Sequence, residues 1–242
     1  MTALLSVEAV SKRFRGLLAV DNVSFRVERG SIFAVIGPNG AGKTTLFNII
    51  AGVFAPDRGS IAFAGDRIDG LAPDEICRRG IGRTFQLVRP FPALTVEDNV
   101  IIGAMLRRHD PAAARRRAHE VLARLDLFGK RHQLASALTL PDRKRLEVAR
   151  ALATDPKLLL LDEVMAGLRP AETDRLVSVL IELNRESGLT ILLIEHVMRA
   201  VMALAARVLV LHHGAPIAEG TPAAVVREPA VVQSYLGAEA VD

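Results

Sequence analysis

The sequence of 242 residues contains a single cysteine, Cys77, and has no long apolar run that is free of charge. One cysteine excludes a disulfide within the chain and is typical of a protein from a reducing compartment. The most apolar region, residues 189–211, is interrupted by Glu195, His196, Arg199 and Arg207. It therefore predicts a buried strand, a helix and a second strand, and not a membrane span.

The sequence also lacks a targeting signal and a strong excess of charge. The first 14 residues have no basic start followed by an apolar stretch, so we expect no signal peptide. Lysine and arginine number 31 against 27 acidic residues, and this net charge of +4 is too small to predict nucleic-acid binding. Arginines gather in residues 106–122. A solvated helical face explains them, with a basic patch for a membrane surface or an acidic partner as the alternative.

Hydrophobic periodicity predicts an α/β organisation. Residues 22–28 alternate polar and apolar, which is typical of a half-buried antiparallel strand. Three continuous apolar runs predict strands buried on both faces, at residues 31–37, 157–163 and 190–195. A helical region is expected over roughly 95–150, and a hairpin around Gly214 followed by a short helix within 206–226. We expect one domain over 1–242, an α/β core with an inserted helical subdomain.

The segment "GPNGAGKT" (37–44) fits the phosphate-binding pattern G-x-x-x-x-G-K-[ST], and it lies between an expected buried strand and an expected helix over 44–52. Its glycines permit a tight loop whose N–H groups point at phosphate oxygens. Lys43 can neutralise β- and γ-phosphates, and the Thr44 hydroxyl can bind Mg²⁺. The nucleotide-binding residues expected here are Gly37, Pro38, Asn39, Gly40, Ala41, Gly42, Lys43, Thr44 and Thr45.

Two carboxylates end the segment "LLLLDE" (158–163). Asp162 falls at the carboxyl end of a buried strand, where ligands bind in open α/β sheets, and is expected to hold Mg²⁺ directly or through water. Glu163 is the expected catalytic residue, because a carboxylate one position further out can orient a water for attack on the γ-phosphate. Helix N-capping is the alternative explanation of this pair.

Three histidines end apolar runs. His196 is expected to hydrogen-bond the γ-phosphate, with a satisfied core histidine as the alternative. His212 and His213 are adjacent on an expected strand, so their side chains are predicted to point to opposite faces and no metal is assigned to them.

These motifs together resemble the ATP-binding subunit of ABC transporters over nearly the whole chain. "GPNGAGKTT" is similar to the Walker A loop, "LLLLDE" to the Walker B strand, and "AGLRP" (166–170) to the D-loop. Gln86, which ends "RTFQ", is similar to the Q-loop glutamine that contacts Mg²⁺, and His196 to the switch histidine. Phe14 is similar to the aromatic residue that stacks on adenine. The resemblance implies a P-loop NTPase (RecA-like) core with an N-terminal antiparallel β subdomain, and the ligands ATP and Mg²⁺.

The finer resemblance is to the branched-chain amino acid importer type, through residues 80–105, 195–211 and "VVQSYLG" (231–237). It implies a peripheral ATPase on the cytoplasmic face of the plasma membrane. Its implied partners are a second cassette, two membrane permeases and, indirectly, an extracytoplasmic solute-binding protein, without nucleic acid. Leucine-like amino acids are the first expectation for the cargo, and urea, short amides or aromatic acids are alternatives.

The family signature L-S-G-G-Q is altered here. Register with "ARAL" (149–152) places Thr139 at the serine, Leu140 and Pro141 at the two glycines, and Asp142 at the glutamine. In the family this stretch completes the partner's ATP site. Pro141 has no N–H to donate, and Asp142 is expected to repel phosphate. Thr139 and Asp142 also fit a helix cap, so a helix is still expected to start here. We therefore predict a heterodimer with two unequal ATP sites.

Four other classes of protein remain as alternatives. A soluble, non-transport ABC-type ATPase of translation or DNA repair generally has two cassettes or a long coiled-coil insertion, and this chain has neither. A P-loop GTPase would need a guanine-recognition motif of the N-K-x-D type, which is not found. A small-molecule kinase would not explain Gln86, "AGLRP" and His196 together, and a binding module without hydrolysis is disfavoured by Glu163.

Overall fold

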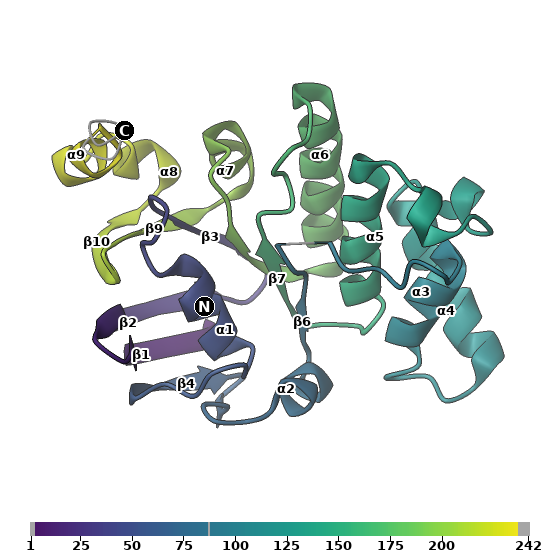
Figure 1. Ribbon diagram of the computed structural model, residues 1–242, viewed down its shortest axis with the longest axis horizontal. Helices are drawn as coiled ribbons and strands as arrows, with labels where there is room; N and C mark the ends of the chain where they lie inside the picture. The colour runs from purple at the N-terminus through teal and green to yellow at the C-terminus, as the bar shows by residue number, and fades with distance from the viewer. Residues whose placement is uncertain (1–2, 87, 237–242) are drawn as a thin grey trace.

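The computed structural model describes residues 3–86 and 88–236. Leu87 and Gly237, which belong to stretches quoted above, lie outside the described residues. The described chain forms a four-stranded sheet in the order β2-β1-β4-β5 and a six-stranded sheet in the order β10-β9-β3-β8-β7-β6. Figure 1 shows the first sheet, in purple and blue, on one side of the second, and most helices on the other side.

The smaller sheet is antiparallel throughout and is built mainly from the start of the chain. Its strands are β1 (Ala3–Phe14), β2 (Leu17–Glu28), β4 (Arg58–Phe63) and β5 (Asp66–Arg67). Val23, Phe25 and Val27 are buried while the residues between them are exposed, so the alternation expected for β2 is confirmed. The hydrophobic face of this sheet packs with α1 (Lys43–Ile50) against the larger sheet.

The larger sheet has five parallel strands and one antiparallel edge strand. Its strands are β3 (Ile32–Ile36), β6 (Ile81–Arg83), β7 (Leu158–Asp162), β8 (Thr190–Ile194), β9 (Arg207–His212) and β10 (Ala215–Gly220). Every residue of β3, β7 and β8 is buried, as the continuous apolar runs predicted. Alternate residues of these three strands and of β9 enter one of two hydrophobic clusters, one on each face of the sheet.

Helices cover the face of the larger sheet that is opposite the antiparallel sheet (Figure 1). The helices on this face that connect or follow its strands are α6 (Pro170–Ser187), α7 (Met198–Leu204), α8 (Pro222–Val225) and α9 (Pro229–Leu236). The short helix α2 (Pro73–Arg79) lies on the other side, where Ile76 joins the hydrophobic cluster shared with the antiparallel sheet. β9 and β10 pair as the hairpin expected around Gly214. None of the helices within residues 3–86 and 88–236 has the length and apolarity needed to cross a membrane.

A separate group of helices stands at one end of the molecule (Figure 1). It consists of α3 (Val96–Ala104), α4 (Pro111–Arg124), α5 (Leu140–Leu152) and two short 3-10 turns, η1 (Phe128–Lys130) and η2 (Ala135–Ala137). Side chains cap these helices: the Thr95 hydroxyl accepts from Asp98 N–H, and Asp110 accepts from two N–H groups of α4. Arginines of α4 pair with acids, such as Arg115 with Glu97, as expected for a solvated helical face.

Candidate nucleotide site

The loop between β3 and α1 can be built only with glycine at two positions. Gly37 has φ 146°, and a Cβ there would lie 2.1 Å from the carbonyl oxygen of Leu211. Gly42 has φ 96°, and a Cβ there would lie 2.2 Å from the carbonyl oxygen of Ala19. Both close approaches are to backbone atoms, which cannot move aside cheaply. The absence of these side chains therefore lets the loop turn tightly onto the N-terminus of α1, where backbone N–H groups are available to an anion.

Lys43 is the first residue of α1 and is only 7% exposed. Its Nζ donates hydrogen bonds to the carbonyl oxygens of Gly37, at 2.7 Å, and Pro38, at 2.9 Å. Burial lowers the pKa of Lys43, while the negative charges of Glu163 and Asp162 act in the opposite direction. The ammonium group thus lies inside the loop with two carboxylates nearby.

A groove of about 420 Å³ runs along this loop. It is lined by Leu17, Leu18, Ala19, Asn39, Gly40, Ala41, Gly42, Lys43, Thr44, Thr45, Gln86, Glu163 and His213. The structure therefore brings most of the predicted phosphate-loop residues to one surface together with two predicted site residues from other segments. Phe14, Asp162 and His196 are not among the lining residues.

Glu163 follows β7 directly and adopts a left-handed backbone conformation, with φ 49°. Its Oε2 accepts a hydrogen bond from Nε2 of Gln86 at 2.9 Å. Residues other than glycine rarely adopt this conformation, and they persist in it only where the surrounding structure holds them there. The conformation and the contact with Gln86 place the carboxylate on the wall of the groove.

Asp162 is the last residue of β7 and is 1% exposed. Nη2 of Arg83 lies 3.5 Å from its Oδ2, and its Oδ1 is buried without a hydrogen-bond partner among the described residues. Burial raises the pKa of Asp162, and the nearby Arg83 opposes that rise. An unpartnered buried carboxylate oxygen suits a site for a hard cation such as Mg²⁺, which prefers oxygen ligands.

The apolar wall of the groove differs from the sequence prediction. Phe14 packs edge-on against Phe54, with ring centroids 5.1 Å apart, and the turn after it carries Leu17 to the groove. Leu17 is 68% exposed. Leu17 is the first residue of β2, and a leucine at the start of a strand gives no sequence signal of such a role, whereas an aromatic residue resembles the family pattern.

The prediction that His212 and His213 point to opposite faces is wrong. Their ring centroids lie 4.0 Å apart. β9 ends at His212, and His213 has φ 47°, so the alternation of a regular strand does not extend to it. His213 lines the groove, which sequence patterning gave no reason to expect. His196 lies two residues beyond the end of β8 and is exposed.

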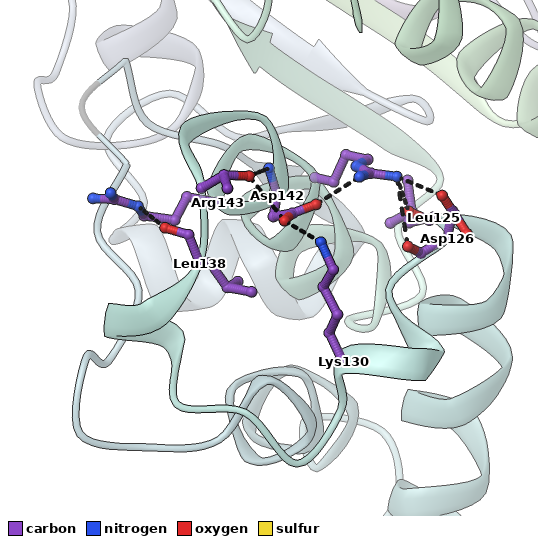
Figure 2. A network of polar contacts seen from close by, with 8 residues as sticks. Leu125, Asp126, Lys130, Leu138, Asp142 and Arg143 are labelled. Carbon is purple, nitrogen blue, oxygen red and sulfur yellow. Dashed lines mark hydrogen bonds and ion pairs between the residues drawn. The ribbon is translucent and has the colours of Figure 1, made fainter.

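The altered signature begins α5, as expected. Thr139 is the N-cap, and its hydroxyl contacts both the N–H and, at 2.8 Å, the carboxylate of Asp142. Figure 2 shows Asp142 at the centre of a polar network that includes Lys130. Nη2 of Arg145 also donates to Asp142, at 2.6 Å.

The expectation that Asp142 repels a phosphate is wrong, because this carboxylate is not presented to the surface. Asp142 is 2% exposed and forms ion pairs with both Lys130 and Arg145. Burial acts to raise the pKa of Asp142, but the hydrogen bonds from Lys130 and Thr139 outweigh it, so the pKa is lowered. The cations neutralise the charge locally, and the carboxylate serves the start of α5.

Two buried ionisable residues near Glu163 were missed by sequence reasoning. Glu195 is 1% exposed, and its Oε1 accepts from the N–H of Met165 at 2.9 Å. Burial raises the pKa of Glu195 to about 7. Lys144, on α5, is 5% exposed. The sequence did contain a signal for Glu195, because it directly follows the apolar run "ILLI". Lys144 gave no such signal, since a lysine on a helix usually faces solvent.

Comparison with known proteins gives consistent matches over nearly the whole chain. The ABC transporter family model matches residues 20–166, and that of the branched-chain amino acid ATP-binding cassette transporter matches 215–241. The "high-affinity branched-chain amino acid transport ATP-binding protein LivG" of Salmonella typhimurium is 40% identical, over 97% of this chain and 98% of its own length. A "sulfate/thiosulfate import ATP-binding protein CysA 2" of Chromobacterium violaceum is 38% identical, over 93% of this chain but 61% of its own length.

Solved structures also match over nearly the whole chain. The ADP conformation of MJ1267, an ATP-binding cassette of an ABC transporter, superposes with a TM-score of 0.89 at 32% identity. The match covers 98% of this chain and 100% of the MJ1267 chain. The architecture of two sheets and one group of inserted helices is therefore that of a known ATP-binding cassette, which confirms the expected fold class.

Proposed function

Because this chain belongs to the ABC transporter family, as an ATP-binding and ATP-hydrolysing subunit, we propose that it energises an importer for branched-chain amino acids or similar small polar solutes. The observation that supports the cargo class is the match to LivG over 98% of the relative's length, together with the family match at 215–241. CysA 2 has nearly the same identity but is matched over only 61% of its length, so identity alone does not set the cargo.

We propose that the groove holds the triphosphate against the loop at 37–44. The loop N–H groups and the Lys43 ammonium bind phosphate oxygens, and Leu17 contacts the adenine side in place of Phe14. Thr44, Gln86 and Asp162 would hold Mg²⁺, which neutralises charge on the phosphate oxygens when bound. The unpartnered Oδ1 of Asp162 supports this assignment.

Hydrolysis needs a carboxylate that orients an attacking water. We assign this role to Glu163, whose side chain is fixed by Nε2 of Gln86 at 2.9 Å. If Gln86 turns to bind Mg²⁺, its hydrogen bond to Glu163 is lost and the carboxylate is free to hold a water. The position of Gln86 therefore affects the position of the Glu163 side chain. His196 follows β8 in the same parallel sheet, and we assign it the γ-phosphate contact.

The proposed partners are a second cassette, two permeases and, indirectly, an extracytoplasmic solute-binding protein, with the chain peripheral to the cytoplasmic face of the membrane. Large apolar side chains are exposed near the segment after Gln86: Phe85, Phe91, Leu94, Ile102 and Met105. They lie between the end of β6 and the residue that follows α3, the segment where the permease is proposed to dock. Several exposed apolar side chains within one segment are typical of an interaction surface.

The second cassette is proposed to be a different chain. Pro141 has no N–H, and the Thr139 hydroxyl is already engaged by Asp142 at 2.8 Å. The signature of this chain therefore has less to offer a partner's triphosphate than L-S-G-G-Q. Its own phosphate loop, Asp162 and Glu163 are complete, so a partner with an intact signature gives one competent site and one weaker site.

Affinity purification of the chain from its host in mild detergent, with mass spectrometry of the bound proteins, tests the proposal. We expect two permeases and one different cassette. Recovery of ribosomal or DNA-repair proteins in their place would contradict the transport role, and recovery of permeases for sulfate would contradict the cargo class alone.

A further inference from the structure

A buried lysine joins two residues of the hydrolytic site through their main chains. Lys144 is 5% exposed and lies just beyond the signature, on the second turn of α5. Its Nζ donates to the carbonyl oxygen of Glu163 at 3.0 Å, and the carbonyl oxygen of Gln86 lies 3.4 Å away. Burying a lysine costs free energy unless its N–H donors are hydrogen-bonded. These two carbonyl contacts therefore hold the buried side chain in position.

The bond to Glu163 falls where the backbone is strained. Glu163 has φ 49°. Its N–H donates to the carbonyl oxygen of Ile194 at 3.0 Å, while its own carbonyl accepts from Lys144 and, at 3.2 Å, from the N–H of Ala166. The peptide units before and after Glu163 are therefore both held, which is what a left-handed non-glycine residue requires.

The negative charges of four carboxylates act on the ammonium group: those of Glu195, Glu163, Asp162 and Glu147. Burial lowers the pKa of Lys144, and these negative charges oppose that effect. Glu147 already pairs with Arg150 at 3.2 Å and Asp162 lies 3.5 Å from Arg83. Lys144 thus places a positive charge between the signature helix and the acids at the ends of β7 and β8.

We propose that Lys144 is a positioning residue for ATP hydrolysis, which holds the Glu163 main chain in its left-handed conformation and ties it to the main chain of Gln86. The inference rests on the proposed role of Glu163. Lys144 acts through hydrogen bonds to carbonyl oxygens and does not touch the nucleotide. Because it belongs to α5, a displacement of the signature helix is transmitted to the carboxylate that orients the attacking water.

The test is steady-state ATP hydrolysis by the full chain in its native complex, with ATP affinity measured separately from a fluorescent ATP analogue. Lys144→Met is expected to lower kcat by about tenfold or more, with KM and nucleotide affinity within about twofold of the unsubstituted protein. Lys144→Arg retains donors and is expected to keep at least about half of the activity. Lys157→Met, at the exposed start of the strand that carries Asp162, is the matched control and should be unchanged.

Each other outcome overturns the inference. A normal kcat for Lys144→Met removes the positioning role, and a raised KM with a normal kcat assigns the residue to nucleotide binding. Loss of activity in Lys144→Arg equal to that in Lys144→Met excludes the hydrogen-bonding role. If Lys144→Met does not fold, Lys144→Leu, which also lacks a donor, is scored by the same split between kcat and KM. Glu163→Gln is measured alongside. If Glu163→Gln remains active, the role proposed for Glu163 fails. If Glu163→Gln is inactive while Lys144→Met is active, only the positioning role of Lys144 fails.

Discussion

At the scale of the single residue, Glu195 shows how burial changes a carboxyl group next to the site. It is 1% exposed, one oxygen accepts from Met165 N–H, and the other, Oε2, has no hydrogen-bond partner among the described residues. Burial raises its pKa from 4.5 to about 7, and the negative charge of Glu163 adds to that rise. The folded protein therefore holds a proton on Glu195 at a pH where the unfolded chain has released it.

Stability is expected to depend on this proton. Between pH 4.5 and about 7 the folded state binds more protons than the unfolded state, so the free energy of unfolding falls as the pH rises through this window. Glu195→Gln keeps an oxygen for Met165 N–H but has no charge to bury. Relative to the unsubstituted chain it should gain stability between about pH 5 and about pH 8, by up to roughly 3 kcal/mol. Urea unfolding at both pH values measures this, and an equal difference at both would refute it.

At the scale of the element, the start of α5 depends on one buried acid. The side chain of Asp142 is 3% exposed and pairs with Lys130 and Arg145, whereas Asp126, which also pairs with Arg145, is 87% exposed. The same arginine thus has one buried and one exposed acidic partner. Ion pairs of the exposed kind contribute little to stability, and buried hydrogen-bonded ones are costly to break.

Asp142→Ala is expected to lower the free energy of unfolding by about 1–3 kcal/mol, because two cations and the Thr139 cap lose their partner. Asp126→Asn is the matched control on the same arginine: it removes the charge but keeps a residue that tolerates the left-handed backbone there, at φ 55°, and should change the free energy of unfolding by less than about 0.5 kcal/mol. Chemical denaturation of both variants measures the contrast. Equal losses would show that the network does not hold the helix start.

The phosphate loop gives a second prediction for an element. Gly42→Ala places a Cβ 2.2 Å from the carbonyl oxygen of Ala19 at φ 96°. We expect ATP affinity to fall by at least about tenfold, because the loop must shift to relieve that contact. Gly129→Ala, where a Cβ meets nothing within 4 Å, is the control and should bind ATP normally. Titration with a fluorescent ATP analogue compares them, and normal binding by Gly42→Ala would contradict the account of the loop.

Much of the fold was predictable because burial leaves a local pattern. Continuous apolar runs at 31–37 and 190–195 predicted β3 and β8, since strands buried on both faces need no polar alternation. The phosphate loop was predictable for a different reason, because its glycines are required by the backbone geometry itself.

The remaining features depend on contacts between distant segments. Asp142 is neutralised by Lys130, and Lys144 donates hydrogen bonds to carbonyl oxygens of Gln86 and Glu163. Only the folded chain brings these partners together. His213 could not be placed from strand alternation, because the backbone leaves the strand there with φ 47°. Local sequence patterns contain no information on such pairings.

At the scale of the whole molecule, we propose that one chain contributes to two ATP sites in different ways. Its groove, lined by Lys43, Thr44 and Glu163, belongs to its own site, and the exposed start of α5 is proposed to face the site of the other cassette. The first has the expected groups, while Pro141 removes an N–H from the second. The proposed complex is therefore asymmetric even though each cassette has the same fold.

The most direct test of this asymmetry is steady-state ATP turnover by the purified complex, with the catalytic glutamate changed to glutamine in one cassette at a time. Glu163→Gln should abolish most turnover, because general-base catalysis is worth about a hundredfold or more. The corresponding change in the partner cassette should cost less, since its site is completed by the altered signature of this chain. Equal losses from the two substitutions would contradict the account.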